Sequence, residues 1–151
     1  MCKFVLDSDH PEPMVVAVDQ VNSRFVDETM LGNYEYPAVR LILTKVIDKY
    51  EAETQQTLIK QKYLHGCRDA DTHVALPLEQ GLKAGTYLLM YSAEFTEEYI
   101  ERKLVVSCYC SRDVMLERVQ VEDYHIDNFN TMDNALYNAV MAEQDIDEDD
   151  Y

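Results

Sequence analysis

The chain has few of the residues that build linkers, disulfide frameworks or basic surfaces. Its 151 residues include four Gly, four Pro, four Cys and no Trp, and 13 basic residues stand against 29 acidic ones. So few Gly and Pro leave little room for linkers or low-complexity segments. A formal net charge of −16 repels phosphate backbones and anionic headgroups. Nucleic acid is therefore not the expected partner, and membrane binding is expected at most in a calcium-dependent form.

Long hydrophobic runs are also absent, and this bears on the compartment. No apolar run approaches the roughly 20 residues of a membrane-spanning helix, and the first ten residues lack the pattern of a signal peptide. The four cysteines, which are Cys2, Cys67, Cys108 and Cys110, follow no disulfide framework. We therefore expect reduced thiols and a cytoplasmic location, with association to the cytoskeleton as one option.

Alternation of apolar and polar residues, the pattern of half-buried strands, dominates from Met14 to Val121. In the strand predicted over Thr86–Phe95, Leu88 and Met90 are apolar on the second face as well, which favours a central strand covered on both sides. The other predicted strands are Met14–Val18, Tyr36–Asp48, Thr57–Leu64, His73–Leu78, Lys103–Cys110 and Val114–Val121. The predicted core contains Val39, Leu41, Leu43, Leu76, Tyr87, Leu89, Leu104 and Val106.

Seven strands joined by short turns such as Gly81–Gly85 predict an all-β fold, an antiparallel two-sheet β-sandwich. We assign the sandwich to residues 14–126. Residues 1–13 are interpreted as an N-terminal extension, and residues 127–151 as a short helix followed by an acidic tail.

The one convincing helical stripe lies within Thr131–Ala142, where Met132, Leu136, Ala139 and Val140 fall on one face. A helix of this length is marginal in water by itself, so the stripe must be buried against something. Because a sandwich closed by two sheets offers little further apolar surface, we expect these four residues to bind a protein partner.

Catalytic residues are not apparent in the sequence. Cys108 and Cys110 fall in a predicted strand, and their spacing is shorter than the spacing of zinc-binding cysteine pairs. Cys67 lies two residues from His65 but lacks the strand-to-helix elbow of a nucleophile. There is also no phosphate-binding loop or dinucleotide fingerprint. We expect a protein without enzymatic activity and without a cofactor.

Acidic clusters offer weak candidates for a metal site, because hard cations prefer several oxygen ligands from loops. The candidates are Glu94, Glu97, Glu98 and Glu101 in a single loop, with Asp69 and Asp71 before another strand. The loop has no Asp at alternate positions and no Gly to turn its carbonyls inward. We expect at most weak, millimolar calcium binding there, and a solvated charge run is the simpler interpretation.

Two segments carry a resemblance to a known family. Leu82-Lys83-Ala84-Gly85-Thr86-Tyr87-Leu88-Leu89-Met90, followed by the acidic loop and Leu104-Val105-Val106, resembles the C2-like β-sandwich domain of calpains, often called domain III. Upstream, Val16 to Arg24 is similar to a segment near the start of that domain. Arg102 and Val105 depart from the family pattern, which usually has Phe and Arg there.

The resemblance implies a non-catalytic module that packs against larger partners, and in calpains the acidic loop is implicated in sensing calcium or phospholipid. The protease core with its catalytic Cys, His and Asn motifs is absent from this sequence, so proteolysis is not implied. We expect a protein-interaction or scaffold module that docks within a larger assembly. A calcium- or phospholipid-responsive regulatory domain is the alternative, and an enzyme is a distant third.

Overall fold

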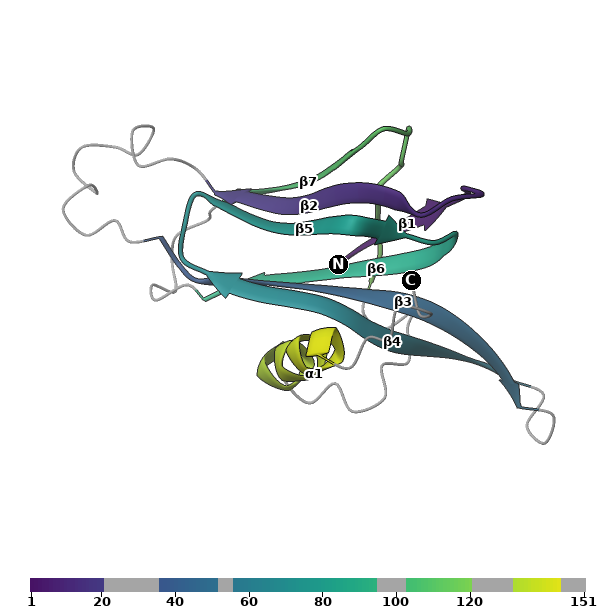
Figure 1. The fold of residues 1–151 in the computed structure, drawn as a ribbon. Coiled ribbons are helices and arrows are strands. Elements are labelled where there is room, and N and C mark those ends of the chain that lie inside the picture. The colour runs from purple at the N-terminus through teal and green to yellow at the C-terminus, as the bar shows by residue number, and fades with distance from the viewer. Residues whose placement is uncertain (21–35, 52–55, 95–102, 121–131, 145–151) are drawn as a thin grey trace.

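The computed structural model describes residues 1–20, 36–51, 56–94, 103–120 and 132–144, and it shows two antiparallel β-sheets packed face to face with one helix (Figure 1). The larger sheet, sheet A, has the order β4 (Gln56–Asp69), β3 (Val39–Glu51), β6 (Gly85–Ala93), β1 (Cys2–Leu6) and β8 (Glu117–Arg118). The smaller sheet, sheet B, has the order β5 (His73–Leu82), β2 (Glu12–Gln20) and β7 (Leu104–Cys110). The helix α1 (Met132–Gln144) lies on the outer side of sheet A. The predicted all-β sandwich with a short helix is confirmed.

Most predicted strands form, but several bounds differ. β4 continues to Asp69, five residues beyond the predicted end, and β5 continues to Leu82. The turn predicted over Gly81–Gly85 therefore shortens to the two residues between Leu82 and Gly85. The last predicted strand shrinks to Glu117–Arg118, which pairs with the start of β1. Ladder pairing with neighbouring strands, which a single segment does not reveal, sets these bounds.

The segment interpreted as an N-terminal extension belongs to the sandwich, and the boundary at Met14 is wrong. Residues Cys2–Leu6 form β1, which pairs in full with β6. Phe4 is 1% exposed, and its ring stacks on Tyr87 with the centroids 5.4 Å apart. β2 also begins at Glu12, two residues before the predicted start. The place of Cys2–Leu6 in the sheet depends on pairing with the distant strand β6, which the segment by itself does not reveal.

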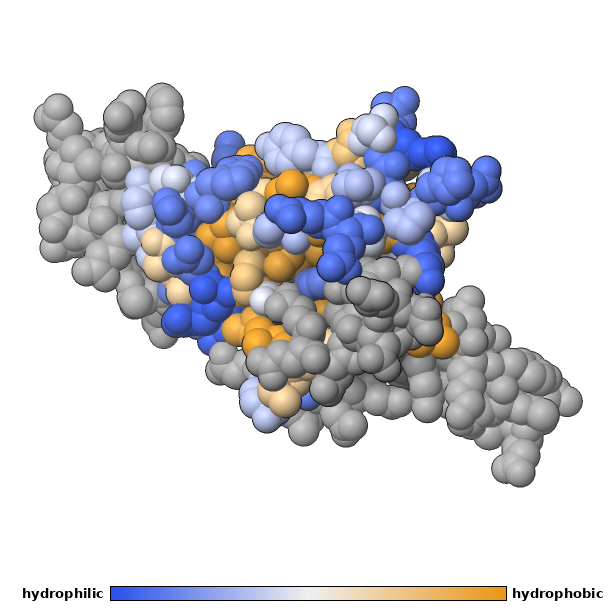
Figure 2. Space-filling model, in the orientation of Figure 1, coloured by the Kyte–Doolittle hydropathy of each residue, from blue (hydrophilic) through white to orange (hydrophobic). Residues whose placement is uncertain are grey.

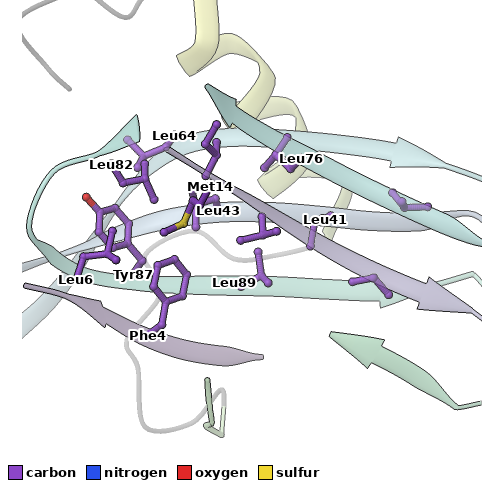
Figure 3. Packing of buried hydrophobic residues seen from close by; sticks show 14 of the residues in the cluster. Phe4, Leu6, Met14, Leu41, Leu43, Leu64, Leu76, Leu82, Tyr87 and Leu89 are labelled. Atoms are coloured by element: carbon purple, nitrogen blue, oxygen red, sulfur yellow. The ribbon is translucent and has the colours of Figure 1, made fainter. Parts of the chain in front are cut away.

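The main core lies between the sheets. Six of the eight predicted core residues are buried, while Leu104 and Val106 on the edge strand β7 are only partly buried. Figure 3 shows Leu64, Leu82 and Tyr87 together at one end of this cluster. The six buried predicted residues are Val39, Leu41, Leu43, Leu76, Tyr87 and Leu89.

A buried amide ties the two sheets together at the end of β2. The side-chain Nε2 of Gln20 donates to the carbonyl of Pro37, just before β3, and to the carbonyl of Asp71, between β4 and β5, each at 2.9 Å. The Gln20 backbone N–H donates to the carbonyl of Thr72 at 2.7 Å. These three bonds hold the ends of strands from both sheets in a fixed relation.

Candidate interaction surfaces

The outer face of sheet A is covered by α1, which contacts β4 and β3. Ala139 is fully buried and Ala135 is 2% exposed, both in a second cluster with Ile42 of β3 and Met90 of β6. Leu136 packs against the same cluster. The two-sided burial expected for β6 is confirmed, because Leu88 and Met90 are both buried.

The helix stripe expected to bind a partner is therefore split. Leu136 and Ala139 lie against the chain's own sheet, so the expectation that they contact a partner instead of the sandwich is wrong. That expectation assumed that the sandwich offers little further apolar surface, but sheet A has an apolar outer surface around Ile42 and Met90. Val140 is 37% exposed and stays available on the surface. Met132 begins the helix, and its side chain lies outside the described residues.

The outer face of sheet B presents a second apolar surface. Since alternate residues of β2, β5 and β7 face the core, the intervening residues face outward. Register places Val15 beside Pro77 and Tyr109, and Ala17 beside Ala75 and Ser107. Tyr109 is 55% exposed, whereas Val15 is partly buried and Ala17 is fully buried.

This face is bounded on one side by charge. Asp19 lies beside Val105 of β7, which is 58% exposed, and beside His73 of β5. The Asp19 Oδ1 and His73 Nδ1 atoms are 2.5 Å apart. Of the described elements, α1 covers sheet A, and Figure 1 shows none on the outer side of sheet B. Exposed apolar side chains such as Val105 and Tyr109, with a polar margin, are typical of a protein-binding surface.

Glu94, the one member of the predicted acidic loop within the described residues, is held by two arginines. Its carboxylate accepts hydrogen bonds from Arg68 at 3.0 and 2.8 Å and forms an ion pair with Arg40 at 2.5 Å. The hydrogen bonds from Arg68, with the positive charge of Arg40, lower the pKa of Glu94. Glu97, Glu98 and Glu101 lie outside the described residues.

The other acidic candidates are bound locally. The carboxylates of Asp69 and Asp71 accept from the backbone N–H groups of Ala70 and Thr72, at 2.7 and 2.6 Å. Within the described ranges, no group of three or more His, Cys, Asp or Glu side chains is arranged to hold a metal ion.

A buried carboxylate that the sequence analysis did not single out joins β2 to the end of β7. Glu12 is 6% exposed and accepts hydrogen bonds from the backbone N–H of Ser111, at 3.0 Å, and from the Ser111 hydroxyl. Arg112 Nε lies 3.7 Å from its other oxygen. The Ser111 hydroxyl bond is the main reason that the pKa of Glu12 is lowered. Glu12 and Ser111 are far apart in the sequence, and only the strand register of the folded sheet brings them together.

The four cysteines are free thiols in or near strands. Burial, with Cys110 as neighbour, raises the pKa of Cys108 to about 12, so that this thiol stays protonated near neutral pH. The Cys67 thiol lies 3.8 Å from the carbonyl of Ala75, to which it donates. The Cys110 thiol donates to the carbonyl of Arg112 at 3.0 Å. These contacts fit structural cysteines within the strands.

Comparisons with protein-family models, with curated proteins and with solved structures give no match for this chain. In the described part of the chain, no helix has both the length and the apolar character needed to cross a membrane.

Proposed function

We propose that this chain is a non-catalytic protein-interaction module of the calpain C2-like type, which docks within a larger cytosolic assembly. The observation that carries the proposal is the outer face of sheet B. Val105 and Tyr109 expose more than half of their surface on a sheet face where no described element lies. Burying such side chains against a partner removes apolar area from water, which stabilises a complex by about 25 cal/mol per Å2 of buried apolar area.

The resemblance to calpain C2-like domains has a packing basis. Leu82 and Tyr87 of the shared motif are 2% and 1% exposed, and they meet at one end of the core. Gly85 begins β6, where an added Cβ would lie 2.9 Å from the Lys45 side chain. These constraints supply a reason for the Leu-x-x-Gly-x-Tyr pattern and support the proposed type.

The regulatory alternative has less support. Calcium binding needs carboxylate oxygens that converge without strong competing partners. The Glu94 carboxylate is instead engaged by Arg40 and Arg68.

The proposal is tested by affinity purification from the source cell with mass spectrometry, comparing three tagged chains. These are the wild type, Val105→Glu/Tyr109→Glu on sheet B, and Met115→Glu as a control at a residue that is 83% exposed elsewhere. We expect a stoichiometric partner with the wild type and the control, and its loss with the double variant. Equal recovery in all three would exclude sheet B as the docking face, and no stoichiometric partner with the wild type would contradict the function.

A further inference from the structure

Four of the described strands lie at the edges of the two sheets. They are β4 and β8 in sheet A, and β5 and β7 in sheet B. An edge strand presents backbone N–H and C=O groups that can pair with another chain, so soluble proteins usually protect such strands by charge, proline, bulges or short length. Three of these four strands are protected in one of those ways, and β7 is not.

The three protected edges use different features. β4 carries Lys62 and Arg68, and its pairing with β3 shifts register once. β8 is only two residues long, and both residues are charged. β5 contains Pro77, which has no backbone N–H, and its pairing with β2 also shifts register. Figure 2, in the orientation of Figure 1, shows hydrophilic residues along β5.

β7 has none of these features. Its seven residues, Leu-Val-Val-Ser-Cys-Tyr-Cys, include no charge and no proline, and they pair with β2 at seven consecutive positions without a register shift. Among the described strands only β2 pairs with β7, which lies at the margin of sheet B (Figure 1). A further extended strand can therefore add to β7 through backbone hydrogen bonds, as in β-augmentation.

Both rows of side chains on β7 leave apolar surface uncovered. The core-facing row consists of Leu104, Val106, Cys108 and Cys110. This row is only partly buried, whereas Val16 and Val18 in the core-facing row of β2 are fully buried. On the outer face, Val105 and Tyr109 are exposed. A strand added beside β7 would remove apolar area of both rows from water.

β7 is complementary to itself in one antiparallel register. All seven residues find a partner only if a two-fold axis passes through Ser107, the central residue. This register places Val105 beside Tyr109 of the second copy on the outer face, and Ser107 beside Ser107. A β-branched residue beside an aromatic one is a favourable cross-strand pair, and no like charges lie opposite each other.

The charge of the whole chain limits the strength of such pairing. Two copies that each carry a net charge of −16 repel each other, and a contact of one strand per copy is small. We therefore expect a weak dimer, with a dissociation constant in the micromolar range. Because β7 itself is uncharged, salt screens only the repulsion and should strengthen the dimer.

We propose that β7 pairs antiparallel with β7 of a second copy of this chain, around a two-fold axis at Ser107. The pairing joins the two copies of sheet B into one continuous sheet with three strands from each copy. It leaves the outer face of that sheet uncovered and does not depend on the proposed function.

Charge at position 107 tests the proposal by sedimentation equilibrium of the purified full chain. Ser107→Lys or Ser107→Glu places like charges opposite each other at the axis, so each variant alone should dimerise several-fold more weakly than wild type. A one-to-one mixture of the two variants places Lys opposite Glu and should restore dimerisation. Ala75→Lys and Ala75→Glu are the matched controls, because register puts Ala75 and Ser107 on either side of Ala17, at opposite edges of sheet B. Both controls should dimerise like wild type.

Three results would overturn the proposal. A wild type that stays monomeric at millimolar concentration would favour a strand of another protein as the occupant of the β7 edge. Dimerisation of the two Ser107 variants at wild-type strength, or a mixture no stronger than either variant alone, would exclude an axis at Ser107. A dimer that weakens as salt rises would indicate an ionic contact elsewhere.

Amide hydrogen exchange provides a second measurement that needs no substitution. In the wild type, amides of β7 should exchange several-fold more slowly at high than at low protein concentration, because pairing adds hydrogen bonds along this edge. Amides of the other edge strand, β5, should exchange at the same rate at both concentrations. A concentration-dependent protection found in β5 and not in β7 would contradict the proposal.

Discussion

Ala139 of α1 lies directly over Gly66 of β4. A Cβ added at Gly66 would lie 2.9 Å from the Ala139 Cβ and 3.0 Å from Leu136 Cδ1. The helix can approach the sheet this closely only because the strand has no side chain at that position and the helix has a small one. This contact fixes where α1 sits on sheet A.

Gly66→Ala should destabilise the fold by about 1–3 kcal/mol, because the added methyl group overpacks the seam between helix and strand. Chemical denaturation measures the loss. A double-mutant cycle provides the control. Ala139→Gly alone should cost about 1 kcal/mol from helix propensity, and in that background Gly66→Ala should cost clearly less. Strictly additive effects would contradict the contact.

Leu136→Ala should lower the free energy of unfolding by about 1–3 kcal/mol, below the range for a fully buried leucine, because Leu136 is only partly buried. Tyr137→Ala is the matched control on the same turn. Its side chain is 66% exposed, so its effect should stay within about 0.5 kcal/mol. Equal effects would mean that the helix does not pack on sheet A.

Phe4→Ala should cost about 3–5 kcal/mol in thermal or chemical unfolding, because Phe4 is buried and stacks on Tyr87. Val5→Ala, at a neighbouring residue that is 56% exposed, should have little effect. A small loss of stability for Phe4→Ala would indicate that β1 is an extension outside the sandwich.

Glu12 should make stability depend on pH in the acid range. Its hydrogen bonds to Ser111 lower its pKa below the ordinary 4.5, so its contribution is present above that pH and is lost as pH falls through the lowered folded-state value. Thermal unfolding between pH 3 and 7 measures this. Glu12→Gln should show a smaller decline below pH 4.5 than wild type, and Ser111→Ala an intermediate one. Identical declines in all three would rule out the contribution.

Calcium should bind no tighter than the millimolar range. Glu94 is already neutralised by Arg40 and Arg68, and no metal-binding cluster occurs in the described ranges. Isothermal titration at physiological salt checks this. A saturable micromolar site that is lost in Glu97→Gln/Glu98→Gln would contradict it and favour the regulatory alternative.

Local alternation in the sequence was sufficient to predict the class of fold. The rows Val39, Leu41, Leu43 and Tyr87, Leu89 repeat every two residues, and a period of two predicts a strand that places this row on one face. The helix is determined in the same way, because its apolar stripe follows a period near 3.6. β1 escaped prediction because its place in the sandwich depends on pairing with the distant strand β6.

Tertiary structure alone decided which surfaces meet. The sequence predicts that Met90, Leu136 and Ala139 are buried, but it does not show that they are buried in one cluster. The absence of a side chain at Gly66 lets the helix approach the sheet closely enough for this contact. In the same way, the sequence alone predicts that Glu94 is a solvated acid. In the folded chain, strand register brings Arg40 and Arg68 beside its carboxylate. Periodicity records how one segment is divided between core and solvent. Contacts between distant segments depend on register and shape across the sheets, which no local pattern contains.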